Sequence, residues 1–282
     1  MKETTWTLFI IFVITVLFLV LFSWPKKSFM ESDFCYIQTA VTGLGDRLLD
    51  ICAVMTKNPD SKIHIKWNIG KDQERSVYDT KLIQLDNGDI SEDTVSCSQN
   101  IEINPTKPGA NAPSIDKVDT FRQMAKRIKP AHVLEEVLPP TSYIAIHIRG
   151  TDKFNDMNPN DPIGVSTEQY KNIKSKCLEY VKTHLDKTYL ICTDDEKLKS
   201  EFIQECGEGM KIVEIKDYKN LDRAIVDLFA ISRAELVIQC TKYSTFSIIA
   251  SLIGGIPLIN YFDSEVMGAD WNWRPFLYGT VG

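Results

Sequence analysis

The sequence predicts an α/β protein: a doubly wound parallel sheet in its C-terminal part, a smaller α/β domain before it, and an apolar N-terminal segment. Three observations predict this organisation. Short apolar segments alternate with helical ones from residue 143 to 261, which is typical of parallel sheets. A strand, a glycine turn and an apolar helix follow one another at 34–51. The run from Trp6 to Trp24 carries no charge.

The uncharged run at 6–24 is long enough to cross a membrane. As a helix rising 1.5 Å per residue it would span about 28 Å, close to the hydrocarbon thickness of a bilayer. A Trp at each end suits the two membrane interfaces. Because Ser23-Trp24-Pro25 is a poor cleavage site, we expect an uncleaved single-pass anchor, with a tail at 1–5 and a stem at 25–33.

The sequence leaves the orientation of this anchor open. Lys2 is opposed by Glu3 on one side, while Lys26 and Lys27 lie on the other, and positive charge favours the cytosolic side. Lys26 and Lys27 thus favour the cytosolic face for the main part of the chain, and the lack of an Asn-x-Ser/Thr acceptor, with Asn104-Pro105-Thr106 blocked by its proline, agrees with this. The Golgi or ER lumen is the alternative, for a eukaryotic type II protein. The seven cysteines form no Cys-x-x-Cys pair, and they leave the redox compartment open.

The composition is that of a globular enzyme and excludes some partners. With 282 residues and a net charge of -6, the chain has room for two modest domains and shows no basic footprint for nucleic acid. The sequence contains no Asp-x-Asp pair and no Cys/His cluster with zinc spacing. We therefore expect no metal and no other cofactor.

The first domain, residues 34–140, is expected to begin with a strand at 34–37 and the glycine turn Gly43-Leu44-Gly45-Asp46-Arg47. Such a turn exposes N–H groups at a helix start, where anions bind; a plain tight turn is the alternative interpretation. Leu48 replaces the third glycine of a dinucleotide fingerprint, which disfavours nicotinamide or flavin. The other expected elements are strands at 62–67 and 81–85, a loop-rich part at 70–118, a helix at 121–128 and a boundary at Pro139-Pro140.

The second domain, residues 141–262, is expected to alternate strands and helices throughout. The predicted strands are 143–148, 188–192, 211–215, 235–239 and 256–261, and the predicted helices are 167–184, a segment ending at 206, 222–232 and 244–253. An aromatic tail at 263–282 follows. We expect this tail to pack across the domains, although it would also suit a carbohydrate site.

A polar cluster follows the strand that ends at Ile148. His147, Arg149 and Lys153 lie where this strand reaches its carboxyl end, and in open α/β sheets ligands bind at that end. A guanidinium, an imidazole and an ammonium together are what a nucleoside diphosphate requires. A strand that simply ends in charged residues is the alternative interpretation.

Four motifs now stand in order along the chain. They are Gly43-Leu44-Gly45-Asp46-Arg47, His147-Ile148-Arg149-Gly150-Thr151-Asp152-Lys153, Thr193-Asp194-Asp195, and Asp227 with Ser244-Thr245-Phe246-Ser247. Together they resemble the GDP-fucose-dependent fucosyltransferases, above all the α1,6 group, whose hallmark is His-x-Arg-Arg-Thr-Asp-Lys. The Ser-Thr-Phe-Ser segment is also similar to the α1,2 enzymes. This resemblance covers residues 34–55 and 142–260, and it implies two Rossmann-like domains of the GT-B type.

The resemblance implies transfer of fucose from GDP-fucose to a glycan hydroxyl with inversion, and it implies roles for individual residues. Arg149 would grip the β-phosphate and neutralise the departing GDP, with Lys153 as a second cation. His147 would hold the nucleotide, and Asp227 would accept from the N1–H and N2–H₂ of guanine. The other implied donor-binding residues are Gly43, Gly45, Arg47, Asp194, Asp195, Ser244, Thr245, Phe246 and Ser247. A helix N-cap is an equally good interpretation of Asp194 and Asp195.

The chain departs from the family at two positions. Gly150 replaces the second arginine, and Met157 stands where the family has an acidic base. A four-residue insertion would place Asp161 at the base position, and Asp156 is our second candidate. Two alternatives therefore remain: another nucleotide-sugar transferase of the same fold, or a glycan or nucleotide binder without catalytic activity.

Overall fold

The computed structural model describes residues 34–38, 43–67, 78–92, 99–103, 113–140, 142–150, 164–216 and 221–262, together with Phe276 and Tyr278. All of them belong to one compact unit, Asp33–Gly282. The predicted anchor at 6–24 and its flanks at 1–5 and 25–33 lie outside the described residues. Within the described part, no helix is both long and apolar enough to span a bilayer.

The C-terminal sheet has the predicted parallel topology. Its strand order is β11-β10-β7-β8-β9, and every neighbouring pair is parallel. The chain leaves β7 toward β8 on one side and later returns as β10 on the other, so the topological switch point lies between β7 and β10. Ligands of open α/β sheets bind at this point. The strands are β7 (Ile144–Ile148), β8 (Thr188–Thr193), β9 (Lys211–Ile212), β10 (Leu236–Gln239) and β11 (Leu258–Asn260).

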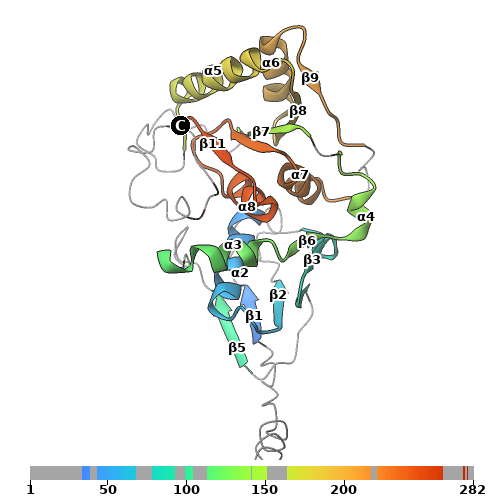
Figure 1. The fold of residues 1–282 in the computed structure, drawn as a ribbon, viewed down its shortest axis with the longest axis vertical. Helices are drawn as coiled ribbons and strands as arrows, with labels where there is room; N and C mark the ends of the chain where they lie inside the picture. Colours follow the sequence, from blue (N-terminus) through green and yellow to red (C-terminus); the bar gives the residue numbers. More distant parts are fainter. Residues whose placement is uncertain are drawn as a thin grey trace, which may run out of the picture. The chain divides into compact units, whose positions relative to one another are not determined.

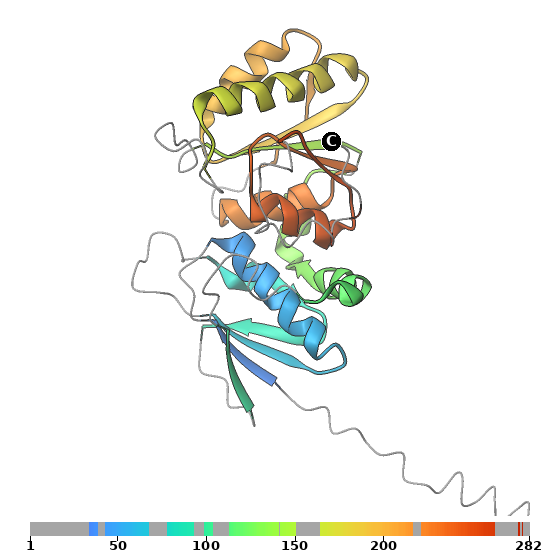
Figure 2. The ribbon, with the colours of Figure 1, turned by 90° about the vertical axis from the view of Figure 1, so that its left-hand side faces the viewer.

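Helices cover both faces of this sheet. In Figures 1 and 2, α5 and α6 lie on one face, while α7 and α8 lie on the other. Polar side chains fix where three of them begin: a capping box joins Ser166 and Gln169 before α5, and Asp195 and Asp222 cap α6 and α7. The helices are α5 (Thr167–Thr183), α6 (Glu196–Cys206), α7 (Arg223–Ser232) and α8 (Thr245–Gly254).

The N-terminal sheet is larger than predicted and mixed. Its order is β5-β1-β2-β4-β3-β6, and β3 runs antiparallel to both β4 and β6. The predicted strand at 34–37 is β1 and that at 62–67 is β2. The segment 70–118, predicted to be loop-rich, contributes three strands to the sheet. The strand predicted at 81–85 is one of them, β3, and it begins only at Ile83 because a 3₁₀ turn precedes it. The strands are β1 (Phe34–Gln38), β2 (Ile63–Trp67), β3 (Ile83–Leu85), β4 (Gly88–Ser91), β5 (Gln99–Ile103) and β6 (Ile128–Pro130).

The helix predicted at 121–128 is shifted toward the N-terminus. It forms α3 (Val118–Ala125), and Ile128 already belongs to β6. Ile128 is fully buried and pairs opposite Leu85 of β3, so strand pairing ends the helical segment early. Three further short elements were not predicted: the 3₁₀ turns η2 (Thr80–Leu82) and η3 (Ile115–Lys117), and α4 (His132–Glu135).

The helix after the glycine turn, α2 (Leu44–Lys57), packs against α8 of the second sheet. Gly45 makes this contact possible, because a Cβ on it would lie 2.5 Å from the backbone N of Phe246. Apolar residues of α2, α3, α7 and α8 belong to one continuous core. The two sheets are therefore joined by packed helices, and the starts of α2 and α8 lie side by side.

Two aromatic residues of the predicted tail lie against α3. The ring of Phe276 is 4.8 Å from that of Phe121, and its carbonyl oxygen accepts from Nε of Arg122 at 2.8 Å. The guanidinium of Arg122 lies 4.6 Å from the ring centre of Tyr278, a cation–π contact. The C-terminal end of the chain thus returns to the N-terminal sheet's helices.

The described cysteines fall into two classes. Cys35, on β1, is disulfide-bonded. The other five are free and buried, which is the usual state of a small apolar core residue. These free cysteines are Cys52, Cys177, Cys192, Cys206 and Cys240.

Candidate functional site

His147 lies at the carboxyl end of β7, next to the switch point. Its side chain is buried, its Nδ1 lies 2.6 Å from Oγ of Ser247, and its ring centre is 5.2 Å from that of Phe246. Burial, with the charge of Arg149 as a second cause, lowers the pKa of His147 to about 4. The imidazole is therefore neutral at physiological pH and acts as a hydrogen-bonding group rather than a cation.

Arg149, two residues further on, carries the positive charge of this edge. Its side chain is half-buried, and its Nε lies 3.9 Å from Oδ2 of Asp194. The other oxygen of the same carboxylate accepts from the backbone N–H of Gly150 at 3.0 Å. Asp194 therefore lies beside the guanidinium and is bonded to the backbone that follows it.

Asp195 has a different role from its neighbour. Its carboxylate accepts from the backbone N–H groups of Lys197, at 2.8 Å, and Leu198, at 3.3 Å, and so caps α6. Of the two interpretations of this acidic pair, the N-cap is the one seen for Asp195, while Asp194 faces the Arg149 side. Asp195 therefore belongs to the α6 cap, and only Asp194 of the pair lies beside Arg149.

The start of α8 carries buried polar atoms that suit a ligand. Ser244 is the N-cap residue, yet its side chain makes no capping bond. Among the described residues, the hydroxyls of Ser244 and Thr241 and Oε1 of Gln239 are buried without a hydrogen-bond partner. Buried polar groups are nearly always paired, and helix N-termini attract anions. The two hydroxyls can donate to an anion at this helix start, whereas Oε1 of Gln239 can only accept a hydrogen bond from a ligand.

The start of α2 completes this edge from the other sheet. Gly43 is its N-cap and offers no side-chain cap, and the N–H of Leu44 donates to the hydroxyl of Tyr78 at 3.1 Å. Gly45 lies directly against Thr245 and Phe246 at the start of α8. The glycine turn and the Ser244–Ser247 segment, two separate motifs of the sequence, thus meet at one place.

Tyr78 was not among the predicted site residues. Burial raises the pKa of its phenol, and three charged side chains act on it: Arg47, Asp222 and Arg149. The backbone N–H of its neighbour Asp79 also donates to Oδ2 of Asp222 at 3.1 Å. No sequence signal marked this tyrosine, because it gains its position only when the segment before β3 meets α7.

Arg47 is fully buried on α2. Its guanidinium lies 4.7 Å from the ring centre of Trp67, which itself meets the ring of Tyr78 edge-on. Burial lowers the pKa of Arg47 from its ordinary value of 12.5, but an arginine remains charged at neutral pH. The aromatic packing thus holds a second permanent positive charge beneath the start of α2.

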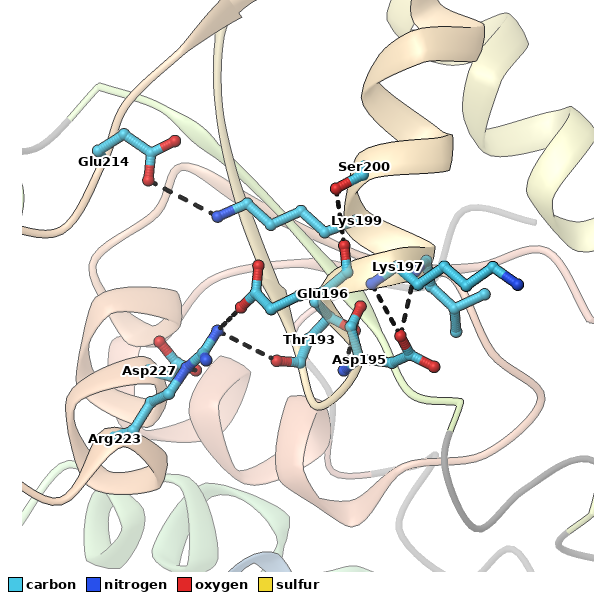
Figure 3. A network of polar contacts seen from close by, with 10 residues as sticks. Thr193, Asp195, Glu196, Lys197, Lys199, Ser200, Glu214, Arg223 and Asp227 are labelled. Atoms are coloured by element: carbon cyan, nitrogen blue, oxygen red, sulfur yellow. Dashed lines mark hydrogen bonds and ion pairs between the residues drawn. The ribbon is translucent and has the colours of Figure 1, made fainter.

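Asp227 lies on α7 within a network of charged groups, which Figure 3 shows. Its side chain is 13% exposed, and Oδ2 lies 3.6 Å from Nε of Arg223, one helical turn earlier. Burial raises the pKa of Asp227 to about 6, while Arg223 lowers it. Asp227 therefore pairs with a residue of its own helix, and its pKa of about 6 lies well above that of an ordinary aspartate.

Three predicted catalytic residues, Lys153, Asp156 and Asp161, lie outside the described residues. Within the described part of the chain, no group of three His, Cys, Asp or Glu side chains could hold a metal ion. The described site thus consists of the ends of β7 and β10, the starts of α2 and α8, and Tyr78.

Comparison with solved structures identifies the fold. A fucosyltransferase NodZ from Bradyrhizobium matches with a TM-score of 0.50 at 15% identity, over 83% of this chain and 96% of that chain. The chain has the fucosyltransferase fold. A NodZ α-1,6-fucosyltransferase soaked with GDP-fucose matches with a TM-score of 0.50 at 15% identity, over 84% and 97% of the two chains. POFUT1 in complex with GDP matches with a TM-score of 0.52 at 11% identity, over 83% and 99%.

The fucosyltransferase fold agrees with the resemblance seen in the sequence motifs, and it accounts for the parallel C-terminal sheet and the α/β domain that precedes it. No protein-family profile matches the sequence, and no curated protein is detectably similar to it in sequence.

Proposed function

We propose that the protein is an inverting glycosyltransferase that moves fucose from GDP-fucose to a hydroxyl of a glycan. The observation that carries this proposal is the meeting of the α2 and α8 starts beside Arg149 at the switch point. Two helix N-termini and a guanidinium suit the diphosphate of a nucleotide sugar. The fucosyltransferase fold and the motif resemblance direct the choice among such donors toward GDP-fucose.

Arg149 is the proposed catalytic residue for the leaving group. As the bond between the anomeric carbon and the diphosphate breaks, negative charge develops on the β-phosphate, and a guanidinium can bind two of its oxygens at once. Asp194 aims this guanidinium, which reduces the reorganisation needed during the reaction. We propose Lys153 as the second cation for the same charge.

The attack on the anomeric carbon needs a base for the acceptor hydroxyl. We propose Asp161 for this role and Asp156 as the second candidate, since both follow the Arg149 motif closely in sequence. The base takes the hydroxyl proton while the oxygen attacks from the face opposite GDP, which inverts the configuration. We also propose that the reaction needs no metal ion, because the cations just described serve the leaving group.

The neutral His147 and the α8 start are proposed to hold the nucleotide. Ser247 fixes the imidazole from the α8 side, and the hydroxyls of Ser244 and Thr241 are the proposed donors to phosphate oxygens. Tyr78 is an added candidate, since its hydroxyl accepts from Leu44 and its own proton can be donated to the ligand. Asp227 is the proposed acceptor for guanine.

We propose a single-pass anchor at 6–24 and a catalytic domain in an oxidising compartment such as the Golgi or ER lumen. The disulfide of Cys35 supports this orientation over the cytosolic one, because disulfides persist in oxidising compartments. Labelling Cys35 with a thiol reagent before and after reduction tests it. Complete labelling of Cys35 before reduction, on protein taken from its native membrane, would indicate instead that the catalytic domain faces the cytosol.

The proposed activity is tested by incubating the full chain, in detergent, with GDP-fucose and a panel of glycan acceptors. We expect labelled fucose to be transferred to an acceptor, with GDP released in equal amount. A β-configured donor should give an α-linked product. GDP-fucose binding without turnover on any acceptor would favour the non-catalytic alternative, for which Gly150 and Met157 are the motivating departures. Turnover of a UDP- or ADP-sugar in preference would favour another transferase of this fold.

A further inference from the structure

Arg223, the first residue of α7, joins three elements at the end of β8. Its Nε lies 3.6 Å from Oδ2 of Asp227 on the same helix, and its Nη2 forms an ion pair with Glu196 at the start of α6. The same nitrogen donates to the carbonyl oxygen of Thr193, the last residue of β8, at 3.5 Å. Figure 3 shows the guanidinium between the two helices and the strand end.

Four groups act on the carboxylate of Asp227, and they come from three elements. Arg223 on its own helix and Lys199 on α6 favour its ionised form, as does the thiol of Cys192 on β8, which donates to it. Glu196 on α6 opposes ionisation. Lys199 is also paired with Glu214, at 3.6 Å. Among the groups that favour the carboxylate, Arg223 has the largest effect.

We infer that Arg223 is a positioning residue for base recognition: it keeps the Asp227 carboxylate ionised and aimed, so that this carboxylate can accept two hydrogen bonds from guanine. The inference rests on the proposed function, which gives Asp227 the guanine. It goes beyond that function because it assigns the state of Asp227 to a residue one turn away that does not touch the ligand.

The geometry separates Arg223 from an ordinary surface pair. Exposed ion pairs at this spacing contribute little, because both side chains move in solvent. Here Asp227 is 13% exposed, and Arg223 is held from the other side by Glu196 and the Thr193 carbonyl. Arg223 itself is 44% exposed, and its contacts with α6 and β8 place its guanidinium beside the carboxylate of Asp227. Without such a partner, burial would favour the protonated, neutral form of the carboxyl, because burying an unpaired charge is costly.

The test is the pH dependence of GDP affinity, measured by calorimetry on the full chain. In the wild type, affinity should fall as the pH drops below about 6, because the carboxyl is then protonated. In Arg223→Gln the midpoint of this loss should move upward by about one pH unit, which amounts to a loss of about twofold at pH 7 and about tenfold at pH 5 and is recovered at pH 8.5. Arg223→Lys should restore most of the wild-type profile.

A second variant shifts the profile in the opposite direction. Glu196→Gln removes the charge that opposes ionisation and that also pairs with Arg223, so the midpoint should move below about 6. Arg233→Gln is the matched control, since Arg233 follows the same helix and is paired with Glu135 outside this network. It should leave the midpoint unchanged. If Arg223→Gln fails to fold, the direction in which the midpoint moves in Glu196→Gln still tests the inference.

An unchanged midpoint in both Arg223→Gln and Glu196→Gln would overturn the inference, even if affinity fell uniformly at every pH. Asp227→Asn separates this failure from that of the proposed function. If it leaves both the GDP affinity and the preference for GDP over inosine diphosphate unchanged, Asp227 does not read the base. In that case a ¹³C carboxyl titration of Asp227 still measures whether Arg223 controls its ionisation.

Discussion

His147 and Ser247, 100 residues apart in the sequence, are joined by a contact of 2.6 Å between Nδ1 and Oγ. The contact ties the carboxyl end of β7 to the first turn of α8, and it lies where the chain reverses its direction across the sheet. A protonated imidazole would be costly here, because the site is buried and Arg149 is close. The fold therefore favours neutral His147, and this makes the free energy of unfolding depend on pH.

The stability of the protein should respond to His147 and Asp227 in opposite directions. Between about pH 6.5 and 4 an unfolded histidine binds a proton that folded His147 does not, so His147 makes stability fall as the pH falls. Between about pH 3.8 and 6 folded Asp227 binds a proton that the unfolded aspartate does not, so Asp227 makes stability fall as the pH rises. Each effect is on the order of 3 kcal/mol.

The two effects should nearly cancel in the wild type between about pH 4.5 and 6, and single variants should expose them. His147→Gln should leave a protein that loses stability as the pH rises through this window. Asp227→Asn should leave one that gains stability over the same range. Urea unfolding at both ends of the window measures the free energies. Equal slopes for the two variants would contradict the assigned protonation states.

Gly45→Ala should destabilise the protein by about 1–3 kcal/mol and lower its activity. A Cβ on Gly45 would lie 2.6 Å from the carbonyl carbon of Thr245, so α2 and α8 would have to move apart at the site. Gly43→Ala is the matched control for stability, because a Cβ there meets nothing within 4 Å, and its cost should stay below about 1 kcal/mol. Thermal unfolding of both variants checks this; equal losses would show that the close approach is unimportant.

Arg149→Ala should lower kcat about 100- to 1,000-fold, since one well-placed donor to a developing charge contributes that much. Arg149→Lys should recover little, because a single ammonium cannot grip two phosphate oxygens. Asp194→Asn should also lower kcat, by less, because the guanidinium would lose its anchor while keeping its charge. Steady-state kinetics with GDP-fucose measures all three. Activity of Arg149→Ala within a few-fold of wild type would remove this residue from the mechanism.

Turnover should persist in excess EDTA, because Arg149 and Lys153 are proposed to take the part that a cation plays in other nucleotide-sugar enzymes. Complete loss of activity with the chelator, restored by Mn²⁺ or Mg²⁺, would contradict the metal-free reaction. A magnesium-dependent reference enzyme in the same buffer shows that the chelator is effective.

The second sheet could be predicted because its strands are continuous apolar runs and its helices carry clear caps. Ile144–Ile148 is buried along its whole length, and Ser166 and Asp222 are N-cap residues of the helices that follow them. The N-terminal sheet was harder, since β4 reads Gly-Asp-Ile-Ser and has little strand propensity of its own. Pairing with β2 makes it a strand, and a single sequence does not reveal such pairing.

The site shows the same division. His147, Arg149 and Asp194 follow strands directly, so the rule for carboxyl ends of parallel strands finds them. Tyr78 lies before a strand rather than at the carboxyl end of one, and only the tertiary contact with Leu44 reveals it. The sequence could not separate the roles of Asp194 and Asp195, because either residue can cap a helix. The direction of the backbone at the start of α6 decides which carboxylate forms the cap.

The proposed GDP-sugar site is tested most directly by the affinity of the full chain for GDP, ADP and UDP, measured by calorimetry at pH 7.5. We expect GDP to bind at least about tenfold more tightly than the other two, because a site built for guanine leaves buried polar groups unpaired with another base. We also expect Arg149→Ala to weaken the binding of all three, since the diphosphate is common to them. Equal affinities for the three nucleotides, or binding that ignores Arg149, would contradict the central claim that this edge of the sheet holds a GDP-sugar.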